Sequence, residues 1–220
     1  MNTEIAEKQP QQPLIRFLAQ SFSVLFHPLF IASYTIYFLI YIHPSAFVGY
    51  DERTRFFRML SVVLFTLIFP AFSTFLAWRL KFIKSLYLHT QRDRIIPYAL
   101  CMFFYWWTWY VFRNLPEIPP VAVNFLLGSF LAICAAWFGN IFFKISMHAV
   151  AMGGFVVFAL MFSFTDDYSS GLYLSMAIFI AGLVCSSRLI LSDHTYREIW
   201  LGLLLGGLAQ WIAWLFPAHP

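Results

Sequence analysis

Seven long apolar stretches divide this sequence, and they limit its fold more than any other feature does. Because an α-helix needs about 20 mostly apolar residues to cross the hydrocarbon core of a bilayer, stretches of this length predict transmembrane helices. They cover residues 22–42, 59–78, 98–112, 121–143, 149–164, 172–191 and 199–216. The stretch 98–112 is the shortest and is dominated by Phe, Tyr and Trp, so it either crosses the bilayer or lies in the interface.

The composition agrees with a membrane protein. Of the 220 residues, 61% are hydrophobic and 11% are charged, whereas soluble domains are about 45–50% apolar and about 25% charged. We therefore predict an all-α fold, a polytopic membrane helix bundle of six to seven transmembrane helices. Residues 1–20 are predicted to form a flexible or interfacial tail, and residues 21–220 a single transmembrane domain. The net charge of +4 favours anionic substrates or lipid headgroups over nucleic acid.

Small residues and cysteines carry two further expectations. Gly202, Gly206 and Gly207 give the last apolar stretch small-residue spacing, which predicts close helix packing. The three cysteines fall in apolar runs without paired spacing, so neither a disulfide framework nor a Cys-based metal site is predicted.

Ionisable residues gather in three of the loops between the apolar stretches. With seven crossings, the loops after the second, fourth and sixth stretches open on the same face of the membrane. Ionisable residues at membrane depth are costly and mark functional sites, so we expect these three loops to form the walls of one site. Its candidate residues are Arg92, Arg94, Lys144, Ser146, His148, Arg188, His194 and Glu198.

His194 is the candidate nucleophile. Glu198 lies four residues later and shares its face if a helix begins nearby. A carboxylate that accepts the imidazole Nδ1–H fixes the tautomer and leaves Nε2 free to attack. A structural hydrogen bond is the alternative for such a pair, and a metal site built from His148, His194, Asp193 and Glu198 is another.

Arginines and a second histidine complete the candidate site. Arg188, Arg94 and Arg92 are candidate phosphate ligands, because guanidiniums bind phosphate oxygens bidentately and phosphoryl transfer is catalysed mainly by positioning and charge stabilisation. Ser146 and His148 stand where the fifth stretch begins, and a helix starting there would direct unpaired N–H groups at an anion. Ser146 would either donate its hydroxyl or cap the helix, and His148 would serve as a general acid.

The order of these residues resembles the type-2 phosphatidic acid phosphatase superfamily, which includes membrane histidine phosphatases and vanadate haloperoxidases. The third motif of that family reads Ser-Arg, five residues, His, three residues, Asp. Ser187-Arg188, His194 and Glu198 follow this spacing, with glutamate in place of aspartate. The second motif, Pro-Ser-Gly-His, is similar to Ile-Ser-Met-His at residues 145–148. The first, Lys, six residues, Arg-Pro, is reduced to Arg94 followed by a proline three residues later.

The resemblance implies roles for the candidate residues. His194 would attack phosphorus and become phosphohistidine, oriented by Glu198, while His148 would protonate the leaving group and then activate water. The phosphoryl oxygens would be held by Arg188, Arg94 and Ser146, with Lys144, Lys84 or Arg92 replacing the missing lysine of the first motif. No metal and no cofactor are implied.

These expectations describe an integral membrane lipid phosphatase that hydrolyses a lipid phosphomonoester or diphosphate. Phosphatidate, phosphatidylglycerol phosphate and polyprenyl diphosphate are the substrate types that the resemblance implies. A lipid phosphotransferase with the same site is one alternative. Because the first and second motifs depart from the family pattern, a catalytically degenerate protein that binds phospholipid or transports a small anion is another.

The distribution of basic residues bears on the orientation in the membrane. Ten of the fourteen Lys and Arg residues lie in the tail or in the loops on the motif side, which by the positive-inside rule favours a cytoplasmic site. Leaving out Arg92, Arg94, Lys144 and Arg188 reduces that majority to six against four. The resemblance favours a protein of the bacterial inner membrane whose site faces the periplasm.

Overall fold

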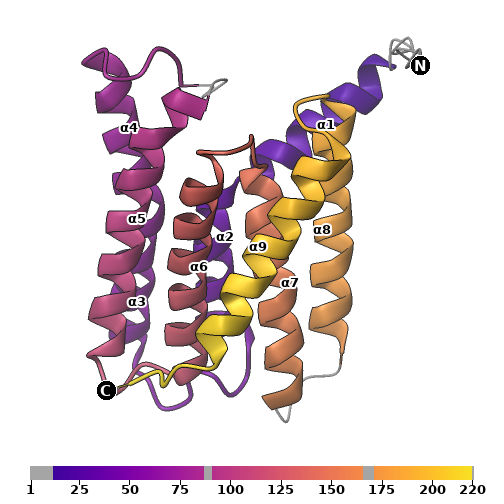
Figure 1. Cartoon of the computed structure of the whole chain (residues 1–220). Helices are drawn as coiled ribbons and strands as arrows, with labels where there is room; N and C mark the ends of the chain where they lie inside the picture. Colours follow the sequence, from indigo (N-terminus) through magenta and orange to yellow (C-terminus); the bar gives the residue numbers. More distant parts are fainter. Residues whose placement is uncertain (1–11, 87–90, 166–170, 220) are drawn as a thin grey trace, which may run out of the picture.

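A computed structural model describes residues 12–86, 91–165 and 171–219, and these residues form helices without any strand. The helices pack into the bundle shown in Figure 1, which confirms the predicted all-α membrane fold. Their bounds are Pro13–Leu25 (α1), Pro28–Tyr37 (α2), Phe38–Ile42 (η1), Glu52–Val63 (α3), Leu64–Ile68 (η2), Phe69–Arg79 (α4), Gln91–Arg113 (α5), Pro120–Gly139 (α6), Met147–Thr165 (α7), Leu172–Ile190 (α8) and Tyr196–Trp214 (α9).

Five helices are long and apolar enough to cross a membrane, as expected of an integral membrane protein. They are the continuous helix Glu52–Arg79, formed by α3, η2 and α4, and the helices α5, α6, α7 and α8. The number rises to six if α1 and the following Pro28–Ile42 count as one bent span. The sequence predicts six to seven transmembrane helices, and the structure has five to six candidates. The difference comes from the first and the last of the predicted spans, residues 22–42 and 199–216.

The first predicted span, residues 22–42, is wrong as a single straight helix. The chain bends by 60° between α1 and Pro28–Ile42. Pro28 lacks a backbone N–H and forces the preceding residue out of the helical region, and His27 is accordingly extended, with φ −60° and ψ 139°. His27 also caps α2, because its Nδ1 accepts the Leu29 N–H at 3.4 Å.

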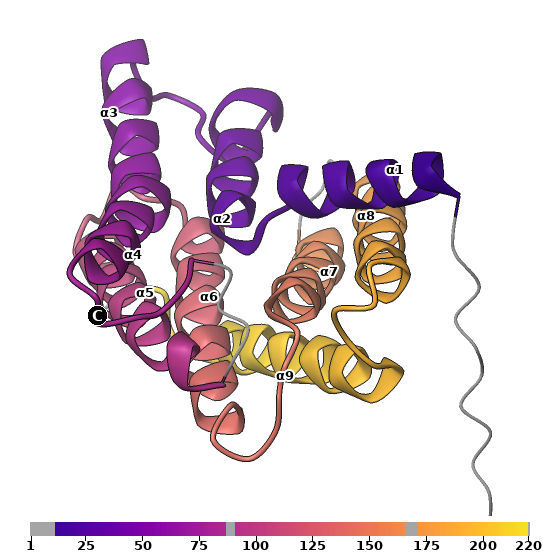
Figure 2. The same cartoon turned by 90° about the horizontal axis from the view of Figure 1, so that it is seen from above.

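The predicted flexible or interfacial tail, residues 1–20, is helical in its C-terminal part. Helix α1 begins at Pro13, so eight of the residues assigned to the tail are helical. Residues 1–11 lie outside the described residues. Figure 2 shows α1 from the side while α7 and α8 are seen nearly end-on, so α1 lies across one end of the bundle.

The short aromatic stretch 98–112 belongs to a longer helix than its apolar residues suggest. Helix α5 extends it to 23 residues, or about 34 Å at 1.5 Å per residue, and it is among the five candidate spans. Helix α9 is not among them. Its first turn carries Arg197 and Glu198, and Gln210 lies four residues before its end, which lowers its apolar content. Even so, α9 runs obliquely along the length of the bundle in Figure 1.

Glycines allow α7 and α9 to approach until their backbones touch. A Cβ at Gly206 would lie 1.9 Å from the Val150 carbonyl oxygen, and one at Gly153 would lie 2.1 Å from the Leu203 carbonyl oxygen. A Cβ at Gly202 would lie 2.9 Å from the Ser146 carbonyl oxygen. The close packing predicted for this small-residue segment is therefore confirmed.

This packing fixes where the ends of the helices lie. Helices α5, α7 and α9 begin, and α8 ends, at the upper end of the bundle in Figure 1, beside α1. At the opposite end, His219 contacts the carbonyl oxygens of Arg113 and Ile118 at 3.0 and 2.9 Å, and Arg58 pairs with Glu117 at 2.6 Å. The loops that carry the candidate motifs therefore open on one end, as the count of crossings predicts.

Candidate active site

A cavity of about 490 Å³ lies at the end where these loops meet. It is bounded by α1, by the first turn of α5, by the connection between α6 and α7, and by the connection between α8 and α9. Its lining residues are Arg16, Gln20, Ser23, Val24, His27, Arg94, Lys144, His148, Arg188, Leu191, Asp193 and His194. Both candidate histidines and three of the predicted basic residues therefore share one cavity, although they are up to 100 residues apart in sequence.

His194 and Glu198 form the predicted pair. The imidazole Nδ1 donates to Glu198 Oε2 at 2.6 Å, and the His194 side chain is only 4% exposed. Local structure sets this geometry, because Thr195 caps α9 by accepting the Glu198 N–H at 3.3 Å and so starts the helix immediately after the histidine. One helical turn then separates the two side chains.

The surroundings of His194 favour its neutral form. Burial lowers the pKa of His194, and the nearby cations Arg188 and Lys144 lower it further, whereas the hydrogen bond to Glu198 opposes the shift. An imidazole that is neutral and donates from Nδ1 carries a free lone pair on Nε2. That is the state a nucleophilic histidine requires.

Arg188 stands in the last turn of α8 with its side chain 14% exposed. Its Nη1 donates to Ser23 Oγ at 2.7 Å, and its Nη2 pairs with Asp193 Oδ2 at 2.8 Å. Both terminal nitrogens of the guanidinium are thus directed into the cavity region, where the fork matches two oxygens of a phosphoryl group.

His148, the second residue of α7, faces α1. Its Nε2 lies 2.9 Å from the Ser23 carbonyl oxygen and 3.3 Å from Ser23 Oγ. Because a carbonyl oxygen only accepts, Nε2 carries the proton in this arrangement. The His27 ring packs edge-to-face against it with 5.5 Å between ring centroids. His148 therefore directs an N–H at the wall of the cavity, and it can act as a general acid there when both ring nitrogens carry a proton.

Two further cations fasten the loops that surround the cavity. Arg94 Nη1 donates to the Ile145 carbonyl oxygen at 2.9 Å, which ties the start of α5 to the segment before α7. Lys144 Nζ donates to the Asp193 carbonyl oxygen at 2.8 Å, which ties that same segment to the connection between α8 and α9. Both side chains line the cavity.

Three predicted residues do not line this cavity. Glu198 is one of them and contacts His194 from outside the lining. Ser146 is fully buried and its Oγ accepts the Ala149 N–H at 3.5 Å, so it takes the helix-capping role. Arg92 lies with Trp137 and Asn140 in a separate cavity of about 340 Å³. The divergence of Arg92 from Arg94 follows from α5 starting at Gln91, because helical residues two apart point to different sides.

Sequence reasoning missed the wall formed by α1. Arg16, Gln20, Ser23 and His27 all line the cavity. Their spacing of four, three and four residues is that of one face of a helix. This polar stripe in an otherwise apolar segment was a signal present in the sequence.

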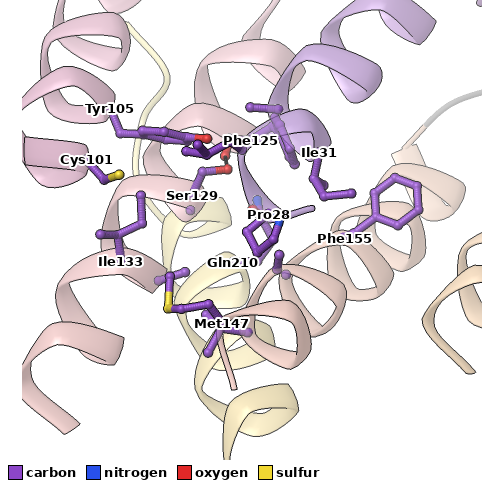
Figure 3. A pocket seen from close by; sticks show the side chains of 17 residues that line it. Pro28, Ile31, Cys101, Tyr105, Phe125, Ser129, Ile133, Met147, Phe155 and Gln210 are labelled. Atoms are coloured by element: carbon purple, nitrogen blue, oxygen red, sulfur yellow. Dashed lines mark hydrogen bonds between the residues drawn. The ribbon is translucent and has the colours of Figure 1, made fainter. Parts of the chain in front are cut away.

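A small apolar cavity of about 70 Å³ lies next to this site, between α2, α5, α6, α7 and α9. Figure 3 shows Pro28 and Met147 beside it, the residues that follow His27 and precede His148 in the chain. Since a water molecule occupies about 30 Å³ of liquid, the cavity is too small for a lipid tail. Gln210 crosses between α6 and α9 here, and its Nε2 donates to the Asn124 carbonyl oxygen at 3.2 Å.

Among the residues that the structure describes, no group of three or more His, Cys, Asp or Glu side chains is arranged to hold a metal ion. No protein-family model, no curated protein and no solved structure matches the chain.

Proposed function

We propose that this chain is a membrane lipid phosphatase that works through a phosphohistidine. The observation that carries the proposal is the cavity in which a neutral, carboxylate-paired His194 and a proton-bearing His148 meet Arg188, Arg94 and Lys144. Catalysis of phosphoryl transfer consists mainly of positioning and charge stabilisation, and this set of residues can supply both.

In the first step, His194 Nε2 attacks phosphorus and the bond from phosphorus to the leaving oxygen breaks. The leaving oxygen takes the Nε2 proton of His148, which enters the step as an imidazolium and leaves it as a neutral imidazole, and the phosphoryl group becomes bonded to Nε2 of His194. Glu198 accepts the Nδ1–H at 2.6 Å, and its carboxylate stabilises the positive charge that develops on the His194 ring. Arg188, Arg94 and Lys144 hold the non-bridging oxygens.

In the second step, His148, now neutral at the nitrogen that gave its proton, takes a proton from water. The resulting hydroxide attacks phosphorus, the bond between phosphorus and His194 Nε2 breaks, and inorganic phosphate leaves. The two histidines return to their starting protonation states, so one water is consumed for each phosphate released.

The position of the cavity supports a lipid substrate. It lies at the end of a bundle of apolar helices, where a lipid headgroup and the polar residues of the loops reach the same depth. The substrate class that fits is a lipid phosphomonoester or diphosphate of the phosphatidate, phosphatidylglycerol phosphate or polyprenyl diphosphate type. We place the protein in a bacterial inner membrane with the site facing the periplasm.

Replacing the nucleophile tests this function. Purified His194→Ala should release phosphate from these lipids at least about 10³-fold more slowly than the wild type, and wild-type protein quenched in alkali should carry acid-labile phosphate on His194. His219→Ala is the matched control, since His219 contacts backbone carbonyl oxygens at the opposite end of the bundle. Unimpaired turnover by His194→Ala would refute the assignment.

A second candidate is a protein that binds phospholipid without turning it over. It is favoured by the position of Ser146, which is buried and caps α7 rather than lining the cavity. Orthovanadate mimics pentacoordinate phosphorus. Tight binding of phospholipid combined with no vanadate binding and no phosphate release would select this candidate over the phosphatase.

A further inference from the structure

The cationic groups of the cavity are occupied by oxygen atoms of the chain itself. Ser23 Oγ accepts from Arg188 Nη1, and the Ser23 carbonyl oxygen accepts from His148 Nε2. Asp193 Oδ2 takes Arg188 Nη2, and its carbonyl oxygen takes Lys144 Nζ. Two residues thus supply four oxygens to three donor side chains, Lys144, His148 and Arg188.

Ser23 stands where a phosphoryl group would be held in the mechanism above. Arg188 receives one oxygen on each terminal nitrogen, at 2.7 and 2.8 Å, which is how a guanidinium grips two oxygens of one phosphate. Ser23 also takes the proton-bearing nitrogen of His148, the group assigned to the leaving oxygen. A phosphoryl group and Ser23 cannot use these donors at the same time.

The helix that carries Ser23, α1, buries few of its residues against the rest of the bundle. Ala19 and Ser23 are the only buried residues of α1, so little apolar area holds it on the bundle. Its outer side exposes large apolar side chains with 43–67% of their surface accessible: Leu14, Ile15, Phe17, Leu18, Val24 and Leu25. Such a helix lies in the interface with its apolar face toward lipid.

The connection to α2 supplies a hinge. The chain bends by 60° at His27–Pro28, and Pro28 has no N–H with which to continue the hydrogen bonding of α1. Rotation at this point would carry Arg16, Gln20 and Ser23 away from the cavity together, since they share one face of α1.

We propose that α1 is a lid over the phosphate site, that Ser23 holds it closed, and that an entering phosphoryl group displaces Ser23 from Arg188 and His148. The inference rests on the proposed function, because it concerns the same site. In the closed state Ser23 accepts the hydrogen bonds of Arg188 and His148. In the open state the phosphate of the lipid headgroup accepts them instead. The rival arrangement, in which Ser23 stays in place and orients the two catalytic groups beside bound phosphate, predicts the opposite result on mutation.

Binding of inorganic phosphate and of orthovanadate to the full-length protein tests the displacement. Ser23→Ala removes the acceptor of Arg188 but leaves the backbone carbonyl that contacts His148, so phosphate should bind about 10-fold tighter than to the wild type. Ser21→Ala is the matched control on the same helix, because the exposed Ser21 hydroxyl donates only to the Phe17 carbonyl oxygen. Unchanged or weaker binding by Ser23→Ala overturns the lid.

A distance measurement tests the movement. Spin labels at Phe17→Cys on α1 and Phe179→Cys on α8, both 67% exposed, are placed in a full-length chain whose three native cysteines are replaced by alanine. Saturating phosphate should shift the distance distribution between the labels, and Ser23→Ala should show part of that shift without phosphate. A distribution that is identical with and without saturating phosphate overturns the lid.

The outcomes separate this inference from the proposed function. Turnover that needs His194, together with no effect of Ser23→Ala and no movement of α1, refutes the lid and leaves the phosphatase standing. Tighter phosphate binding and movement without any turnover of lipid phosphates support the lid and refute the phosphatase. If neither the wild type nor Ser23→Ala binds phosphate, both the lid and the phosphatase are refuted.

Discussion

The pairing of His194 with Glu198 joins local structure to chemistry at the scale of single residues. Thr195 starts α9, the start of α9 puts Glu198 one turn beyond His194, and the 2.6 Å hydrogen bond fixes which imidazole nitrogen is free. The carboxylate has two separable effects, since it accepts a hydrogen bond and it carries a charge.

Substitution of Glu198 separates the two effects. Glu198→Gln keeps an oxygen that can accept the Nδ1–H but loses the charge that stabilises the phosphorylated ring, so we expect kcat to fall by about 10²–10³-fold with KM nearly unchanged. Glu198→Asp keeps the charge on a shorter arm and should retain more activity than Glu198→Gln. Steady-state kinetics on a lipid phosphate measure both, with Glu117→Gln, which breaks the pair with Arg58 at the opposite end, as the control. Equal kcat for Glu198→Gln and wild type would contradict this role.

The lowered pKa of His194 also makes stability depend on pH. Because burial lowers the pKa of the folded state below the unfolded value of about 6.5, the unfolded chain binds more protons than the folded one once the pH falls below that value. The free energy of unfolding therefore decreases as the pH is lowered from 7 toward the folded pKa. Melting temperatures measured between pH 7 and pH 5 should fall more steeply for the wild type than for His194→Gln, which cannot titrate. Parallel curves would show that His194 does not carry the effect.

At the scale of helices, the contact between α7 and α9 positions the two histidines relative to each other. His148 is the second residue of α7, and His194 lies two residues before the first residue of α9. A shift between the helices would therefore displace the proposed general acid from the proposed nucleophile.

Enlarging a glycine at this contact should destabilise the bundle. A Cβ at Gly206 would lie 1.9 Å from the Val150 carbonyl oxygen, and because backbone cannot yield as a side-chain end does, Gly206→Ala should cost at least about 2 kcal/mol. Gly182→Ala is the matched control, since its Cβ would meet nothing within 4 Å in the middle of α8 and alanine favours a helix by about 1 kcal/mol over glycine. Thermal unfolding in detergent should show a lower melting temperature for Gly206→Ala alone. Equal melting temperatures for the two variants would contradict the close approach.

The sequence predicted the helices better than it predicted which faces they present. Apolar length located most helices and placed the motif loops at one end, because both properties follow from crossing a bilayer. The prediction that Arg92 belongs to the site was wrong. The apolar run begins seven residues after the start of α5, so it did not show that Arg92 and Arg94 lie within the helix and point to different sides. Apolar length also failed for α1, because residues 13–20 were assigned to the tail and residues 22–42 read as one continuous stretch unless the break at Pro28 is given its full weight.

At the scale of the whole molecule, the cationic cavity lies at one end of the bundle. At the other end the described contacts of Arg58 with Glu117 and of His219 with backbone carbonyl oxygens involve none of the candidate site residues. Helix α9 begins beside the cavity, and the chain that follows it reaches the far end, where His219 contacts Arg113. The two ends must then face opposite sides of the membrane if the bundle spans it.

Labelling of single cysteines in bacterial cells tests this arrangement and its direction. In a chain whose native cysteines are replaced by alanine, Ser192→Cys marks the exposed connection between α8 and α9, and Val48→Cys, 67% exposed, marks the loop before α3 at the far end. With the cavity facing the periplasm, a membrane-impermeant maleimide should label Ser192→Cys in intact cells and Val48→Cys only after lysis. The reverse pattern would place the cavity in the cytoplasm, in line with the excess of basic residues on its side, and would change the accessible substrates to lipids of the inner leaflet. Labelling of both positions in intact cells would contradict an arrangement with the two ends on opposite sides of the membrane. The helices that carry the site would then not cross the bilayer, and the prediction that the motif loops share one face depends on those crossings.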